Sequence, residues 1–111
     1  MEHFIHRENV SNYLDQLRGE TDPAKRHTLR SLLVAEMKKF ADASANLDLT
    51  DLHLSDCKLR IARQRRIIDG LRLEQRSAAE AEHLLDNLLD IETLLANLRS
   101  DAVSGLSRGR R

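Results

Sequence analysis

The side chains that could bind a metal are scattered along the chain. His3 and His6 lie three residues apart, a spacing that can place two imidazoles on one helix face. No third ligand accompanies them, and we expect a solvated pair at a frayed terminus. The only acid at ligand spacing before a histidine is Glu80, before His83, and its role as a helix cap accounts for it. The other histidines are isolated among polar neighbours, so we expect them at the surface: His27, His53 and His83. We predict no metal and no cofactor.

Catalytic motifs are also missing from the sequence. No nucleophile stands near a base and an orienting acid in a recognisable pattern, and no glycine-rich phosphate loop occurs. Cys57 is the single cysteine, so it has no internal disulfide partner, and a reducing cytoplasm is the natural setting. We expect Cys57 to be a small buried apolar residue, with an intermolecular disulfide as the alternative. The sequence therefore predicts a cytoplasmic protein that is not an enzyme.

Arginine side chains are the remaining candidates for binding. Some lie in the second half of the chain and some in a C-terminal tail, and together they could contact a nucleic acid through its phosphates: Arg60, Arg63, Arg66, Arg108, Arg110 and Arg111. The alternative is a solvated helix face and a flexible tail. The net charge is zero, with 18 basic and 18 acidic residues, which argues against a strongly basic nucleic-acid binder. Nucleic-acid binding therefore stays an alternative function.

The composition indicates that helices position these groups. The 111 residues include 20 Leu and 11 Ala, but only one Pro, two Phe, one Tyr and no Trp. The chain start carries charges in place of an apolar leader, and no run approaches the roughly 20 apolar residues that a membrane span needs. We predict an all-α protein of two antiparallel helical hairpins, with no membrane association.

The first predicted hairpin covers residues 1–46. Gly19 suits a helix C-terminus in the left-handed conformation, and Asp22 followed by Pro23 suits the next N-terminus. Apolar positions on the two sides pair in a constant antiparallel register: Leu17 with Leu29, Leu14 with Leu32, Tyr13 with Leu33, and Val10 with Met37. Residues 46–50 are interpreted as a connector, with the third helix starting near Asp51 and capped by Asp48 or Thr50.

The second predicted hairpin lies within residues 47–103, followed by a basic flexible tail, 104–111. Ser77 and Glu80 fit a capping box, which places a turn near residues 75–77. Heptad positions on both sides pair in one coiled-coil register: Leu71 with Ala81, Ile68 with Leu84, Gln64 with Leu88, Ile61 with Ile91, Cys57 with Leu95, and Leu54 with Leu98. Gln64 either fixes this register or reaches solvent, and Gly70 marks either a close helix approach or nothing.

Charge supports the pairing of these two helices. Residues 58–76 contain seven basic side chains against two acids, and residues 77–103 contain six acids against one arginine. Opposite charge on adjacent helices favours their docking, with Lys58 and Glu92 as one expected flanking pair.

The last helix is apolar beyond the face that meets its neighbour. Four side chains widen the stripe and would form a partner or dimer interface: Leu85, Leu89, Leu94 and Ile67. The surface covering them is either the first hairpin, in a monomeric four-helix bundle, or a second copy of the chain. We favour the homodimer, and with it a non-enzymatic protein-interaction, regulatory or scaffold function.

Two segments carry a resemblance to known proteins. Residues 20–26 with the leucines that follow, and residues 60–71 with 81–85, resemble segments of small, largely uncharacterised helical-hairpin proteins of alphaproteobacteria. Those proteins often have a longer, glycine-containing turn where this chain has Gln75-Arg76-Ser77. The resemblance implies a helical fold in a bacterial cytoplasm and no catalytic residue.

Overall fold

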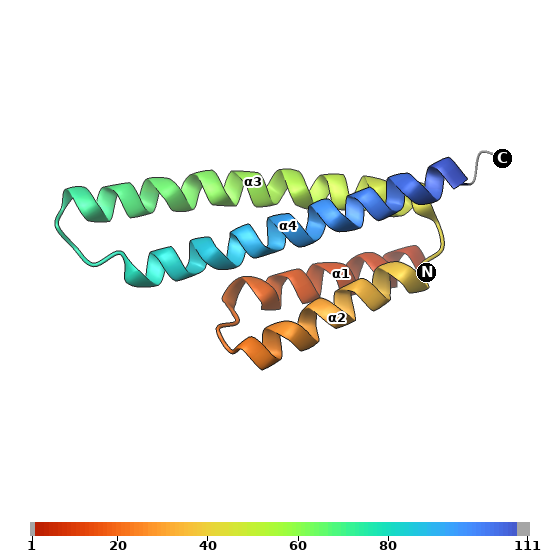
Figure 1. Cartoon of the computed structure of the whole chain (residues 1–111), viewed down its shortest axis with the longest axis horizontal. Coiled ribbons are helices and arrows are strands. Elements are labelled where there is room, and N and C mark those ends of the chain that lie inside the picture. The colour runs from red at the N-terminus through yellow and green to blue at the C-terminus, as the bar shows by residue number, and fades with distance from the viewer. Residues whose placement is uncertain (1, 109–111) are drawn as a thin grey trace.

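The computed structural model describes residues 2–108, and these form four helices with no strand among them (Figure 1). Helix α1 spans Glu2–Gly19, α2 spans Pro23–Lys39, α3 spans Ala43–Leu73 and α4 spans Ala79–Arg108. The predicted all-α fold with two antiparallel hairpins is confirmed. The described part of the chain is elongated, with extents of 58 × 26 × 22 Å.

The turn of the first hairpin forms largely as the sequence indicates. The carboxylate of Asp22 accepts a hydrogen bond from the Lys25 backbone N–H at 3.1 Å, and Pro23 occupies the first helical position. Helix α1 does end at Gly19, but this glycine does not have a positive φ. The left-handed prediction is wrong because the Glu20 N–H still bonds to the Gln16 carbonyl at 3.0 Å, so the helical backbone continues through the glycine.

The junction between α2 and α3 differs from the prediction. Helix α3 starts at Ala43 and is capped by Asp42, which accepts from the Ala45 N–H at 3.0 Å. Residues 46–50 are therefore helix and not a connector, and neither Asp48 nor Thr50 is the cap. Thr50 is buried, and its hydroxyl donates to carbonyls one helical turn earlier, so its polar group needs no solvent.

The turn of the long hairpin is closed by a Schellman motif. The Arg76 N–H bonds to the Leu71 carbonyl at 2.8 Å and the Gln75 N–H bonds to the Arg72 carbonyl at 3.0 Å. Gln75 takes the left-handed position, with a φ of 57°. In place of the predicted capping box between Ser77 and Glu80, the Ser77 hydroxyl accepts a hydrogen bond from the Ala79 N–H, two residues later, at 3.4 Å.

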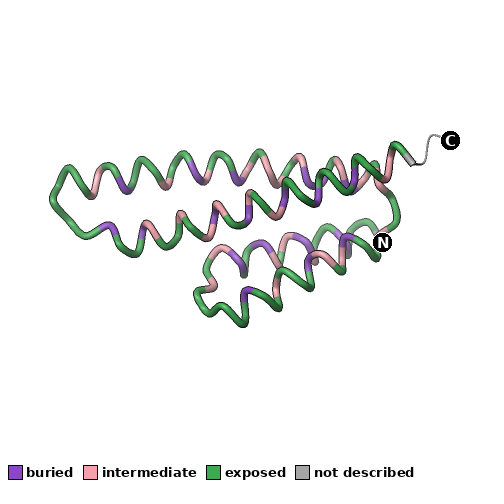
Figure 2. Tube along the Cα trace, in the orientation of Figure 1, coloured by how far each residue is buried: buried purple, intermediate pink, exposed green. Residues whose placement is uncertain are grey.

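The core lies where the short α1–α2 hairpin packs against the long α3–α4 hairpin, mainly on α4 (Figures 1 and 2). Side chains from all four helices form one buried cluster: Val10, Leu14, Leu17, Leu33, Met37, Leu49, Cys57, Ile61, Leu88, Ile91, Leu95 and Leu98. Of the eight positions paired in the predicted first hairpin, seven lie in this cluster or pack against it. Leu32 is the exception, since 43% of its surface is exposed.

The long hairpin has a different register from the predicted one. The Cys57 thiol donates to the Leu88 carbonyl at 3.3 Å, and the Gln64 amide donates to the Ala81 carbonyl at 2.9 Å. The prediction pairs Cys57 with Leu95 and Gln64 with Leu88, one heptad further along α4. Both acceptors are backbone carbonyls, and the side-chain contacts shift less: Ile68 packs with Ala81, three residues before its predicted partner Leu84. The turn over residues 74–78 is long enough for α4 to begin beside the body of α3.

The shift also changes the layer around Ile68. Ala78 and Ala81 form a small second core cluster with Ile68, and half-buried Leu85 packs against it. The predicted partner, Leu84, has 45% of its surface exposed. The Gln64 side-chain amide donates a hydrogen bond to the α4 backbone. Gly70 does not mark a close helix approach, since no neighbouring helix of the described chain comes within 4 Å of the position that its Cβ would take.

The first hairpin supplies much of the third surface that the apolar stripe requires. Leu85, Leu89 and Leu94 are half-buried and pack against the main core cluster. Ile67 remains open, with 47% of its surface exposed. The monomer thus already covers part of the face that we expected in a dimer interface.

The segment expected as a flexible tail is partly helix. Helix α4 continues through residues 104–108. A Cβ on Gly105 would lie 3.2 Å from the Ala43 Cβ, so the end of α4 passes close to the start of α3. The expectation of flexibility was wrong for this part because it relied on composition and missed this packing.

Candidate interaction surface

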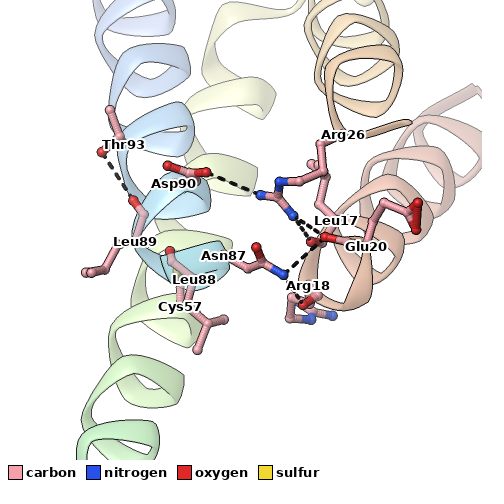
Figure 3. A network of polar contacts seen from close by, with 10 residues as sticks. All are labelled: Leu17, Arg18, Glu20, Arg26, Cys57, Asn87, Leu88, Leu89, Asp90 and Thr93. Atoms are coloured by element: carbon pink, nitrogen blue, oxygen red, sulfur yellow. Dashed lines mark hydrogen bonds and ion pairs between the residues drawn. The ribbon is translucent and has the colours of Figure 1, made fainter. Parts of the chain in front are cut away.

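Arg26 joins the two hairpins at the turn of the first (Figure 3). Its side chain is 6% exposed, and Nη1 donates to the carbonyls of Leu17 at 2.6 Å and Glu20 at 2.8 Å. These carbonyls belong to the C-terminal end of α1, where the helix leaves its own acceptors unused. Nη2 lies 3.5 Å from a carboxylate oxygen of Asp90 on α4 and makes no hydrogen bond. A cation at a helix C-terminus is also favoured by the helix dipole.

Asn87 of α4 completes this cap from the other hairpin. Its Nδ2 donates to the carbonyls of Arg18 at 3.1 Å and Glu20 at 3.2 Å (Figure 3). The contact fixes the point along α4 at which the first hairpin ends. The part of the long hairpin beyond this point, residues 60–86, projects past the first hairpin, and we call it the arm (Figure 1).

A pocket of about 210 Å³ lies at the base of the arm, between α1, α3 and α4. Its lining combines three arginines with one amide and two leucines and contains no carboxylate: Arg18, Arg60, Arg63, Gln64, Leu84 and Leu88. Two predicted arginines, Arg60 and Arg63, therefore meet Arg18 from the other hairpin. Such a pocket can bind an anionic group that also carries apolar surface.

The positive charge of this pocket is only partly neutralised. Arg18 pairs with Asp15 one turn earlier, and Arg60 pairs with Asp56 at 2.7 Å. Arg63 forms no ion pair within residues 2–108. Burial lowers the pKa of Arg18, and the positive charge of Arg60 lowers it further. An anion bound here would relieve that repulsion.

Apolar side chains lie on the same side of the arm. Ile67 follows Arg60 by seven residues and Arg63 by four, so the helical repeat places all three on one side of α3. Leu84 lines the pocket from α4. The first hairpin packs further along the long hairpin and leaves Ile67 and Leu84 47% and 45% exposed.

The other predicted arginines are not brought to the pocket. Arg66 is exposed on α3, Arg108 is the last residue of α4, and Arg110 and Arg111 lie outside the described residues. Two ion pairs join α3 to α4, from Arg72 to Glu82 at 2.6 Å and from Arg99 to Asp51 at 2.5 Å. The expected pair of Lys58 with Glu92 does not form.

His6 is the clearest correction among the chemical side chains. It is 4% exposed, not solvated, and its ring stacks on Phe40 with centroids 4.3 Å apart. Nδ1 lies 3.1 Å from the Glu36 carboxylate and Nε2 lies 2.9 Å from Asn46 Oδ1. Asn46 also donates to the carbonyls of Met37 and Phe40, at 3.1 and 2.9 Å. The histidine therefore joins α1 to the α2–α3 junction.

The remaining histidines and the cysteine are mostly as expected. His27 and His83 are exposed, whereas His53 is half-buried, and burial lowers its pKa. Cys57 is 3% exposed, as predicted, and burial raises the pKa of its thiol to about 11. Within residues 2–108, no three histidine, cysteine, aspartate or glutamate side chains are grouped to hold a metal ion.

Several residues of this surface escape sequence reasoning. Arg18, Arg26 and Asn87 belong to no motif, and their roles depend on how the hairpins dock. The sequence offers one weak sign that these side chains are buried: Arg26 and Asn87 lie near the apolar positions of their helices.

Comparisons with known proteins add no relative. No family model matches the chain, and neither the curated proteins nor the solved structures contain a significant match. The resemblance to alphaproteobacterial hairpin proteins thus stays a prediction. None of the helices in the described part is both long and apolar enough to cross a membrane.

Proposed function

We propose that this chain is a non-enzymatic interaction or scaffold protein of the cytoplasm, and that its partner docks on the arm. The observation that carries the proposal is the incomplete cover of the long hairpin. The first hairpin packs against one half of it and leaves Ile67 and Leu84 exposed on the other half. Apolar side chains beside a charged pocket are typical of a protein-interaction surface.

Docking on the arm fits the structure better than the predicted dimer through all four stripe residues. Leu89 and Leu94 are half-buried against the core that the first hairpin completes, so they offer a partner less surface than exposed residues do. A partner that docks on the arm contacts Ile67 and Leu84, which are already exposed. Self-association through the arm is one form that this function can take.

The test replaces single residues of the chain with a photo-activatable phenylalanine analogue and crosslinks each variant to its neighbours in cells of the source organism. We expect Ile67 and Leu84 variants to give a discrete protein adduct that survives nuclease treatment. The matched control is Ala62, which is exposed on the same helix but about 140° around it from Ile67. An adduct of twice the chain's own mass identifies self-association. Adducts of equal yield at Ala62, or none at all, contradict the proposal.

Nucleic-acid binding is the second candidate. It is favoured by one observation, that Arg63, Arg65 and Arg66 on α3 form no ion pair within residues 2–108. Its signature is binding to duplex DNA or RNA that weakens steeply with salt. A crosslinked adduct that nuclease removes would favour this function over protein interaction.

A further inference from the structure

The pocket at the base of the arm offers two kinds of surface side by side. It is lined by three arginines, Arg18, Arg60 and Arg63, and by two leucines, Leu84 and Leu88. Its volume of about 210 Å³ accommodates a carboxylate side chain together with part of a neighbouring residue. The open side of the arm continues from this pocket to Ile67.

We propose that this pocket and the open side of the arm bind an acidic amphipathic helix of a partner protein. The inference rests on the proposed interaction function and names the chemistry of the partner. Carboxylates of the partner helix contact the arginines, and its apolar side chains cover Ile67 and Leu84. This is the helix-in-groove mode of recognition, in which side chains at helical spacing fill a groove between two helices.

Charge complementarity selects an acidic partner. No carboxylate lines the pocket, Arg63 lacks an ion-pair partner among the described residues, and the charge of Arg60 adds to the burial that lowers the pKa of Arg18. Arginine binds carboxylates through paired N–H groups, and exclusion of water by adjacent leucines strengthens such contacts.

The dimensions of the surface select a helix. Arg60 and Ile67, the two ends of this surface on α3, are separated by about two helical turns, or roughly 10 Å. A partner helix of about three to four turns would cover this length. Its acidic side chains would meet the arginines at the base, and its apolar stripe would lie over Ile67 further out.

A second copy of the chain is a poorer occupant of this pocket. In a two-fold symmetric contact, the same patch of each copy faces the other, and this pocket holds arginines without a carboxylate to receive them. Duplex nucleic acid would neutralise the arginines but would leave Ile67 and Leu84 exposed to a polar backbone. Both remain outcomes that the experiment separates.

The experiment measures binding of labelled probes to the full chain by fluorescence anisotropy. The first probe is a synthetic helical peptide with leucines at helical spacing and glutamates beside them. The second replaces each glutamate with lysine, and the third is a short duplex DNA. We expect the chain to bind the acidic peptide at least about tenfold more tightly than the basic peptide.

Two charge reversals locate the site. Arg63→Glu should weaken binding of the acidic peptide by about tenfold or more, because it places like charge against the peptide. Arg65→Glu is the matched control, since Arg65 is exposed two residues later and therefore on nearly the opposite side of α3. We expect it to stay within about twofold of the parent chain, since exposed charges at a distance are screened. Leu84→Ser should weaken binding as well, and thermal unfolding checks that each variant folds.

Three results would overturn the inference. They are equal binding of the acidic and basic peptides, equal losses for Arg63→Glu and Arg65→Glu, and tighter binding of duplex DNA than of the acidic peptide. If these occur while Ile67 still yields a nuclease-resistant adduct in cells, the interaction function stands and only the acidic helix is refuted. If the adduct is also absent, both proposals fail.

Discussion

Among the polar side chains of the bundle, Arg26 is the one whose replacement we expect to lower the free energy of unfolding most. Its guanidinium satisfies two carbonyls at the end of α1 while its side chain is 6% exposed. Arg26→Met keeps the apolar stem and removes both hydrogen bonds. The carbonyls of Leu17 and Glu20 would then lose this donor at the interface of three helices.

The size of the effect follows from the two bonds. Hydrogen bonds from a charged donor contribute about 1.5–3 kcal/mol each, and the shorter bond, to Leu17, is buried. We add nothing for Asp90, because that carboxylate is 55% exposed and lies 3.5 Å away. The expected loss is about 3 kcal/mol, a large part of the roughly 5–15 kcal/mol that stabilises a domain of this kind. The midpoint of thermal unfolding should fall by about 12 °C.

Chemical denaturation followed by circular dichroism measures this loss directly. Arg30→Met is the control, since Arg30 is exposed one turn later on the same helix, and it should change the free energy of unfolding by less than about 0.5 kcal/mol. Asp90→Asn should have a similarly small effect. A loss below about 1 kcal/mol for Arg26→Met would refute the reasoning, because it would mean that water replaces the guanidinium without penalty.

Three further changes test other parts of the structure. Asn46→Ala removes the donor to the Met37 and Phe40 carbonyls and should lower the free energy of unfolding by about 2–3 kcal/mol, measured by urea denaturation; no change would mean that the end of α2 is capped in another way. Gln75→Gly should raise it by up to about 1 kcal/mol because Gln75 holds a φ of 57°, whereas a decrease would argue against the left-handed turn. Because burial raises the pKa of Cys57 from 9.0 to about 11, the unfolded chain loses the thiol proton first as pH rises. The resulting stability is complete below pH 9 and is lost towards pH 11, so Cys57→Ala should flatten this decline; identical slopes would count against a buried thiol.

The fold was predictable as far as local signals reach. Asp22 with Pro23 marked the start of α2, and the periodicity of leucines identified the paired helices. The start of α3 was misplaced because Asn46 and Thr50 look like polar loop residues, yet both are buried and hydrogen-bonded within or beside helices. The predicted register of the long hairpin is displaced by three to four residues, since Ile68 packs with Ala81 in place of Leu84, because both seam positions of a heptad are apolar and one can take the place of the other.

The candidate site was predictable only in part. Arg60 and Arg63 stood out by charge, but Arg18 comes from the other hairpin, and only the docking of the hairpins brings it to them. The open side of the arm has the same origin. Sequence indicated that an apolar stripe needed a covering surface, and the length of the first hairpin decides where that cover ends.

The most direct test of the account is whether the open side of the arm is covered in cells. Single Ile67→Cys and Ala62→Cys variants would be labelled with a maleimide, both as purified chains and in living cells of the source organism. The native Cys57 is buried and contributes little. We predict that both introduced thiols react readily in the purified chain and that only the thiol at position 67 is protected in cells. Equal labelling of the two positions in cells would contradict the proposal that a partner docks on the arm.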